Sequence, residues 1–314
     1  MSTTAALLIA VSSDIAPLLT LVMDSVSSLH SKRMYRRAII DFVAWFQQNA
    51  PGPLSKAVVQ QYRTHLETLG RAPATINLRL TAIRKLAMEA ADNGLMAPEL
   101  AAGIARVAGA RMAGRRTGHW LLPVQAEALI GLPHAESRKG KRDRVILGFL
   151  IGCGLRRDEL AHLWIDQIQQ RDGRWVILDL TGKGNRVRTV AIPAWGKVMV
   201  DDWTTAALIA SGFLLRPINK CDRIVGESIT AESIYKIVRG YGVDLKLTVA
   251  PHDLRRTFAK LAHKGHAPLE QIQLTLGHAS ITTTERYLGV RQNLADAPCD
   301  HLGLNLQKDT DRVR

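Results

Sequence analysis

The stretch from Pro251 to Gly289, PHDLRRTFAKLAHKGHAPLEQIQLTLGHASITTTERYLG, constrains this chain more than any other part of the sequence. His252 and Arg255 are three positions apart in an amphipathic helical pattern, which places both side chains on one face, about a turn from each other. A second short helical pattern ends just before His278, where the backbone can aim the imidazole. Tyr287 follows nine residues later. Each residue alone is typical of an ordinary cap or a half-buried surface group, so its meaning depends on the rest of the chain.

The region from about residue 13 to residue 106 predicts helices only. Ser31 is a candidate N-cap for a helix in which apolar residues repeat at helical spacing up to Phe46. Ser55 is a candidate cap for the next helix. Pro73 opens a third helix, which closes at Asn93 and the glycine after it.

Further along the chain, two β-rich runs span residues 175–180 and 187–192. They are separated by Thr181 and the run Gly182-Lys183-Gly184-Asn185, which is a hairpin signature. Helical patterns precede and follow this hairpin. The sequence therefore predicts a mainly α protein with a small β-sheet.

Two further segments decide how the histidines, the arginine and the tyrosine are interpreted: GLRRDEL at 154–160 and GKGNRVR at 182–188. With them the chain resembles the tyrosine recombinase (phage-integrase-like) family, in a form similar to the Xer enzymes. The resemblance covers roughly residues 121–289, and its five elements stand in the family's order. These elements are GLRxxEL at 154–160, GKGxxxR at 182–188, HxLRxT at 252–257, LGH at 276–278, and the tyrosine at 287.

This resemblance implies a two-domain fold and a DNA strand-exchange activity. We expect a helical core-binding (SAM-like) DNA-binding domain at 13–106, a basic linker at 107–120, a mixed α+β catalytic domain at 121–301 and a tail at 302–314. The implied reaction is cleavage and rejoining of DNA through a 3′-phosphotyrosyl intermediate, in integration, excision or resolution.

A DNA phosphodiester repels nucleophiles and has a poor alkoxide leaving group, so catalysis needs charge neutralisation, a positioned nucleophile and a proton donor. Guanidinium groups fork the non-bridging oxygens better than ammonium groups do. The resemblance supplies a candidate for each role: Arg156 and Arg255 as the phosphate fork, Tyr287 as the nucleophile, His252 as the proton acceptor, Lys183 as the general acid, His278 as a phosphate hydrogen-bond donor, and Glu159 as the carboxylate that orients the basic groups. Arg256 departs from the family, which often has His at this position.

A polyanionic partner is indicated by the net charge of +14, from 42 Lys and Arg against 28 Asp and Glu. We expect double-stranded DNA carrying paired recombination sites. Basic residues of the third helix and of the acid-free linker are the candidates for phosphate contact. These candidates are Arg79, Arg84, Lys85, Arg111, Arg115 and Arg116.

The remaining expectations concern state and location. The scattered Cys153, Cys221 and Cys299 indicate a reducing compartment, and the apolar N-terminus is too interrupted to span a membrane. We expect a cytoplasmic, nucleoid-associated enzyme that needs no metal or other cofactor. It is expected to act as a homotetramer on DNA, because strand exchange between two duplexes needs four active sites, and to be a monomer when free in solution.

Two alternatives stay open at this level. A type IB topoisomerase-like enzyme would use a similar set of residues as a monomer and would relax supercoils without a defined site. A DNA-binding architectural protein that has lost catalysis would bind DNA without cleaving it.

Overall fold

The computed structural model describes residues 15–50, 52–111, 119–182 and 186–288, without the side chains of His30, Arg286 and Tyr287. The chain divides into two compact units, Met1–Arg115 and Arg116–Arg314. The narrower domain limits suggested by the sequence stay predictions. No helix in the described part of the chain is both long and apolar enough to cross a lipid bilayer.

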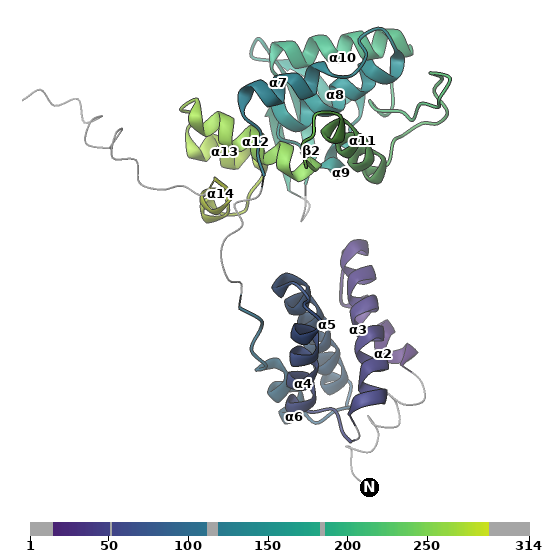
Figure 1. The fold of residues 1–314 in the computed structure, drawn as a ribbon, viewed down its shortest axis with the longest axis vertical. Helices are drawn as coiled ribbons and strands as arrows, with labels where there is room; N and C mark the ends of the chain where they lie inside the picture. Colours follow the sequence, from purple (N-terminus) through teal and green to yellow (C-terminus); the bar gives the residue numbers. More distant parts are fainter. Residues whose placement is uncertain (1–14, 51, 112–118, 183–185, 289–314) are drawn as a thin grey trace, which may run out of the picture. The chain divides into compact units, whose positions relative to one another are not determined.

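The N-terminal unit is helical throughout its described residues, and Figure 1 shows α3, α4 and α5 side by side. This agrees with the expected SAM-like architecture. The helices are α2 (Ala16–Asp24), α3 (Leu29–Asn49), α4 (Lys56–Thr68), α5 (Pro73–Asp92) and α6 (Pro98–Ala105).

Local signals explain most of these helix ends, with one correction. Ser55 caps α4, and Pro73 stands in the first turn of α5, as predicted. The predicted cap at Ser31 is wrong, because α3 begins two residues earlier and Ser28 accepts a hydrogen bond from the backbone N–H of Ser31. The N-cap of α3 is therefore Ser28, and the backbone N–H of Ser31 donates to it.

The core of this unit is aliphatic and aromatic. Ile76, Leu80 and Ile83 of α5 are fully buried, and they pack within one cluster with side chains of α2, α3 and α4. The rings of Phe42 and Tyr62 meet edge to face with centroids 5.0 Å apart. This core is closed by residues of the N-terminal unit itself.

The C-terminal unit contains helices and a small sheet (Figure 1). Its helices are α7 (Pro123–Gly131), α8 (Arg138–Gly152), α9 (Arg157–Ala161), α10 (Ala194–Ala207), α11 (Ala231–Asp244), α12 (Pro251–Lys264), α13 (Leu269–Leu276) and α14 (Ile281–Leu288), with a short 3₁₀ turn η1 (Ile165–Gln167).

The sheet is antiparallel in the order β1-β2-β3, built from β1 (Ile168–Arg171), β2 (Arg174–Thr181) and β3 (Val187–Ala191). The predicted hairpin of β2 and β3 is present, with Ile177 paired to Val190 and Leu180 paired to Arg188. Strand β1 was not predicted, since three of its four residues are exposed and polar. The hairpin brings Arg188 toward the segments that carry the other candidate residues.

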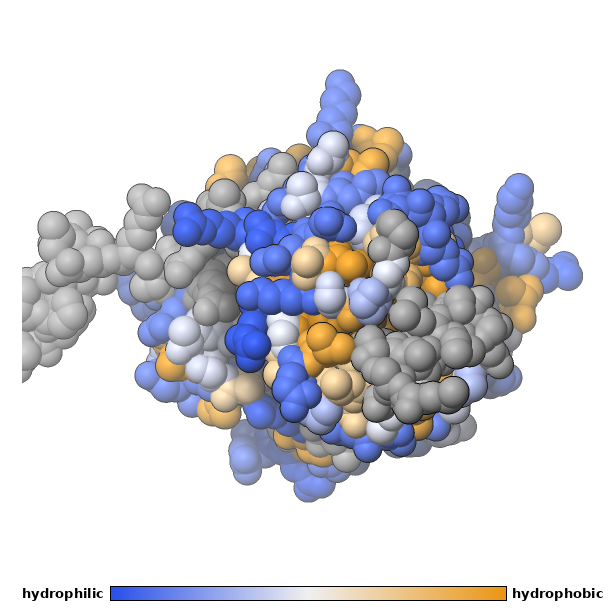
Figure 2. Space-filling view, turned by 90° about the horizontal axis from the view of Figure 1, so that it is seen from below, coloured by the Kyte–Doolittle hydropathy of each residue, from blue (hydrophilic) through white to orange (hydrophobic). Residues whose placement is uncertain are grey.

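The centre of this unit is α8, against which α10 and α12 pack. Its buried residues from Val145 to Ile151 form one cluster with Ile177 and Val190 of the sheet and Leu254 of α12. This core fixes α9, the hairpin and α12 relative to one another. Figure 2 shows a face seen from below Figure 1, and on it hydrophilic residues predominate while hydrophobic ones gather near the centre of the view.

Candidate active site

The turn between α8 and α9 positions the first pair of functional residues. Gly154 adopts φ +61°, and a Cβ there would come within 2.6 Å of the Phe258 ring, so only glycine fits. Arg156 then caps α9, and its backbone N–H donates to Glu159 Oε2 at 2.8 Å. The Arg156 guanidinium donates a second hydrogen bond to Glu159, from Nη1 to Oε1 at 2.5 Å. A buried carboxylate therefore fixes both the backbone and the side chain of Arg156.

Arg188 on β3 makes the second contact with this carboxylate. It donates from Nη1 to Glu159 Oε1 at 3.0 Å and from Nη2 to Oε2 at 2.8 Å, a bidentate pair. Its Nε donates to the carbonyl of Thr275 at 2.8 Å. A Cβ on Gly182 or on Gly277 would lie 3.0 Å from the Arg188 side chain. The guanidinium thus joins the hairpin, α9 and the end of α13.

Arg255 completes the arrangement from α12. Its side chain is buried, donates to the carbonyls of Gly154 and Leu276, and lies 3.9 Å from Glu159 Oε2. Three guanidinium groups therefore surround one carboxylate, which leaves positive charge in excess. Burial raises the pKa of Glu159, but the hydrogen bonds and charges of Arg188 and Arg156 outweigh it and hold that pKa below its usual value.

His252 lies in the first turn of α12, three residues before Arg255. A cavity of about 430 Å³ is lined by Arg156, His252 and Arg255, together with Tyr235 of α11. The His252 residue is exposed at this cavity, yet partial burial of its ring and the charges of Arg256 and Arg255 lower its pKa. A neutral imidazole beside two guanidinium groups is suited to accept a proton.

His278 enters from the turn after α13. Gly277 ends α13 in the left-handed conformation at φ +60°, and the backbone N–H and carbonyl of His278 both bond to Gln273. Its ring Nδ1 lies 2.9 Å from the hydroxyl of Thr284. Burial and the charges of Arg255 and Arg156 lower the pKa of His278 to about 4. The same cations thus act on both imidazoles.

The structure accordingly brings together five of the seven residues predicted for catalysis: Arg156, Glu159, His252, Arg255 and His278. Lys183 and the side chain of Tyr287 lie outside the described residues. Helix α14, which contains position 287, packs on α12 and α13 through the buried Leu288. The catalytic role of each residue stays a prediction.

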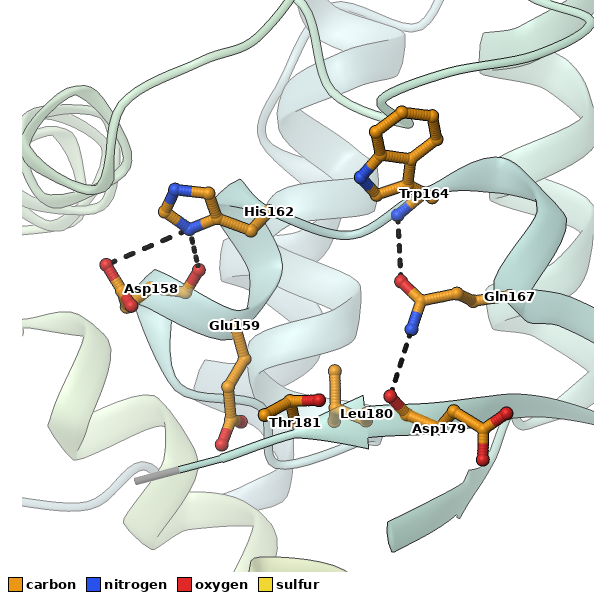
Figure 3. A pocket seen from close by; sticks show the side chains of 8 residues that line it. All are labelled: Asp158, Glu159, His162, Trp164, Gln167, Asp179, Leu180 and Thr181. Carbon is orange, nitrogen blue, oxygen red and sulfur yellow. Dashed lines mark hydrogen bonds and ion pairs between the residues drawn. The ribbon is translucent and has the colours of Figure 1, made fainter. Parts of the chain in front are cut away.

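A second cavity, of about 520 Å³, lies beside Glu159 and β2. Figure 3 shows Asp158 and Asp179 at its edge, with Gln167 between Trp164 and β2. Carboxylates repel a phosphodiester, so this cavity is unsuited to the reacting phosphate. Among the described residues, no group of His, Cys, Asp and Glu side chains gathers as metal ligands do.

The predicted DNA contacts of α5 have partners inside the N-terminal unit. Arg79 donates to Asp41 at 2.7 Å and to the Tyr62 hydroxyl at 2.9 Å. Arg84 donates to the carbonyl of Val107, and Lys85 pairs with Glu89 at 3.1 Å. Their role in DNA binding stays a prediction.

In the linker, Arg111 is exposed. Arg115 and Arg116 lie outside the described residues. Two functional candidates received no role from the sequence, Arg188 and Thr284. The GKGxxxR pattern contains Arg188, so a signal was available. Thr284 belongs to a run of three threonines, and the sequence does not show which of the three faces the inside of the helix.

The comparisons with known proteins agree with this geometry. Residues 119–293 match the phage integrase family, and residues 18–94 match the phage integrase N-terminal SAM-like domain. Tyrosine recombinase XerC of Myxococcus xanthus is 31% identical over 285 residues, covering 84% of this chain and 88% of the relative. Tyrosine recombinase XerD of Lacticaseibacillus casei is 27% identical over 261 residues, covering 81% and 85%.

Solved structures show the same fold. XerH site-specific recombinase bound to palindromic difH substrate, in a post-cleavage complex, superposes with a TM-score of 0.66 at 20% identity, covering 83% of this chain and 76% of that one. A lambda integrase dimer bound to a COC′ core site gives a TM-score of 0.60 at 15% identity, covering 83% and 89%.

The helical N-terminal unit and the arginine–imidazole site of the α+β unit define an enzyme of the tyrosine recombinase class, which cleaves and rejoins DNA. The chain belongs to the phage integrase family, and its activity is site-specific DNA recombination. The topoisomerase-like and architectural alternatives are not favoured.

Proposed function

We propose that this enzyme recombines paired DNA sites by covalent catalysis through Tyr287. The phenolic oxygen attacks the scissile phosphorus, the P–O5′ bond breaks, and a 3′-phosphotyrosyl bond and a free 5′-hydroxyl form. The observation that carries the proposal is the convergence of Arg156, Arg255 and His252 around one cavity, with His278 under the charges of the same two arginines. A 5′-hydroxyl from the partner duplex then attacks the phosphotyrosine, so each bond broken is replaced by an equivalent one.

The proton transfers follow from the charge states of the site. The phenol of Tyr287, with an ordinary pKa of about 10, loses its proton as it attacks, and neutral His252 accepts it. Lys183 donates a proton to the departing 5′-oxygen. This balance needs no metal and no other cofactor, because the phosphotyrosine conserves the energy of the phosphodiester.

Arg156 and Arg255 neutralise the non-bridging oxygens, and the neutral His278 donates a hydrogen bond to one of them. These contacts strengthen as the phosphorus becomes pentavalent, so they lower the barrier more than they tighten ground-state binding. Glu159 acts through the arginines: its carboxylate holds the Arg156 guanidinium by a direct hydrogen bond. Without it, the site would lose its fixed fork geometry.

Tyr287 is proposed to act within its own chain. The support is α14, which packs on α12 and α13 of the same chain through Leu288, beside Ile272 and Leu276. Short-range docking of this kind keeps the nucleophile's helix beside the phosphate site.

The proposed partner is double-stranded DNA, because relatives of the same fold are recorded on a difH substrate and on a core site. We propose that four copies assemble on two such sites and that the free chain is a monomer in solution. The basic residues of α5 and the linker would add phosphate contacts. Among them, Arg111 of the linker is exposed. A cytoplasmic, nucleoid-associated location follows from such a substrate.

A suicide duplex tests the nucleophile. The duplex carries the enzyme's recombination site, located first by footprinting, and a nick just 3′ of the cleavage position that lets the short fragment with the freed 5′-hydroxyl diffuse away. Wild-type protein should accumulate a covalent adduct that resists denaturant, and Tyr287→Phe should form none. Tyr235→Phe is the matched control, because Tyr235 lines the cavity on another helix. An adduct with Tyr287→Phe but none with Tyr235→Phe would reverse the assignment.

A further inference from the structure

Thr284 is the one residue of its threonine run that turns inward. Its exposed fraction is 0%, whereas Thr282 and Thr283 are exposed. Its hydroxyl oxygen lies 2.9 Å from Nδ1 of His278. A buried hydroxyl is costly unless it is hydrogen-bonded, so this contact accounts for a polar group at a core position.

The backbone of His278 leaves the orientation of its ring to be set elsewhere. Both backbone polar groups of His278 bond to Gln273, which fixes the turn. The rotation of the imidazole about its side-chain bonds and its tautomer depend on the partners of the ring. A partner on one ring nitrogen fixes both, because a neutral imidazole has one N–H and one acceptor nitrogen.

We propose that Thr284 is a positioning residue: its hydroxyl donates to Nδ1 of His278 and so holds the proton on Nε2, which then faces the DNA phosphate as a donor. The proposal rests on the role given above to His278 and deepens it. The pKa of His278, lowered to about 4 by burial and by the charges of Arg255 and Arg156, keeps the ring neutral near pH 7, so its tautomer decides whether it can donate.

The same contact couples His278 to the docking of α14. Leu288 follows Thr284 by four residues, on the same face of the helix, and is buried against Ala259, Ile272 and Leu276. The hydroxyl reaches the imidazole only when this face is docked. The helix that carries position 287 and the ring that donates to the phosphate are therefore organised together.

Three variants test the proposal. Thr284→Val keeps the shape and removes the hydroxyl, Thr284→Ser keeps the hydroxyl, and Thr283→Val is a matched control at an exposed neighbour. Single-turnover cleavage of the suicide duplex should slow by about tenfold in Thr284→Val, the effect of one lost hydrogen bond in the transition state. DNA affinity should stay at the wild-type level. Thr284→Ser should recover most of the rate, and Thr283→Val should not change it.

A spectroscopic reading separates positioning from mere packing. The ¹⁵N shifts of the His278 ring in wild type should report an Nε2–H tautomer with Nδ1 accepting, and Thr284→Val should shift toward a mixture of tautomers. Thr284→Ser should keep the wild-type pattern. In a His278→Ala background, Thr284→Val should cause no further loss of rate, since both residues act through one ring.

Two results would overturn the proposal: wild-type ring shifts in Thr284→Val, or a folded Thr284→Ser that cleaves as slowly as Thr284→Val. Where Thr284→Val unfolds, a folded Thr284→Ser whose His278 ring shows a mixture of tautomers would overturn the proposal. An adduct that persists in Tyr287→Phe would instead refute the proposed function, and it would leave the tautomer measurement on the free protein unaffected.

Discussion

Each unit of the molecule contains an arginine–carboxylate cluster, and the two clusters differ in surplus charge. In the N-terminal unit, Asp41 accepts from Arg37 at 2.9 Å and from Arg79 at 2.7 Å, with 24% of its side chain exposed. In the C-terminal unit, Glu159 is 4% exposed and has three guanidinium groups within 4.0 Å. The pairing chemistry is the same, but the second cluster holds more cations and its carboxylate is less exposed.

The difference explains why only one cluster is suited to catalysis. Arg79 is shared between Asp41 and the Tyr62 hydroxyl, and Arg37 is 78% exposed, so solvent screens its charge. Around Glu159 the additional arginines act on two imidazoles, lowering the pKa of each. A buried carboxylate outnumbered by cations orients them without neutralising them.

The largest expected effect is on chemistry. Arg156→Gln should slow single-turnover cleavage of the suicide duplex by about 10²–10³-fold, because one charged donor to the transition state is lost. Arg79→Gln, the matched change in the other cluster, should leave the rate at saturating protein unchanged. Equal losses of rate in the two variants would show that the clusters do not differ in function.

Stability should separate the two carboxylates next. Glu159→Gln leaves two buried guanidinium groups and the partly exposed one of Arg156 without their anion, and it should lower the free energy of unfolding by about 3–5 kcal/mol. Asp41→Asn should cost about 1 kcal/mol, since its cluster is partly solvated. Urea denaturation of both variants against wild type measures the difference. A larger loss of unfolding free energy in Asp41→Asn than in Glu159→Gln would mean that burial of the carboxylate does not determine how much each cluster stabilises the fold.

The pH dependence of stability follows from His278. Its pKa of about 4 lies below the ordinary value of about 6.5, so the unfolded chain binds more protons between these values. Its stabilising contribution is therefore complete above about pH 6.5 and is lost as pH falls toward 4. His278→Gln should lose less stability between pH 7 and pH 5 than wild type. Parallel curves for the two proteins would contradict the burial of this ring among cations.

Much of this arrangement was predictable from the sequence. Three of the five motifs identified Arg156, Glu159, His252, Arg255 and His278, because functional groups recur at fixed spacing on a helix or a turn. Pro73 and Asn93 marked the ends of α5 correctly, since a proline start and an Asn-Gly stop are local signals.

The parts that were not predicted depend on contacts between distant segments. Arg79 pairs with Asp41, 38 positions away, so its exposure could not be inferred from helical spacing. Arg188 reaches Thr275, 87 positions away, by way of a hairpin whose register includes an irregularity. Strand β1 carries no apolar alternation because only one of its residues is part-buried.

The smallest expected effect concerns the influence of the Arg256 charge on the pKa of His252. Arg256 is the largest cationic cause of the lowered pKa of His252 after burial, whereas Lys260, one turn further on, acts on it less than Arg256, Arg255 and Arg156 do. Arg256→Gln should therefore raise the pKa of His252, and Lys260→Gln should leave it in place. Proton NMR titration of the His252 ring measures both.

If the rise occurs, the acidic limb of the cleavage rate should move to higher pH, because His252 must be neutral to accept the proton of Tyr287. If Lys260→Gln raises the pKa equally, the effect is one of net charge, and the local arrangement that distinguishes this cluster from that of Asp41 is not its cause.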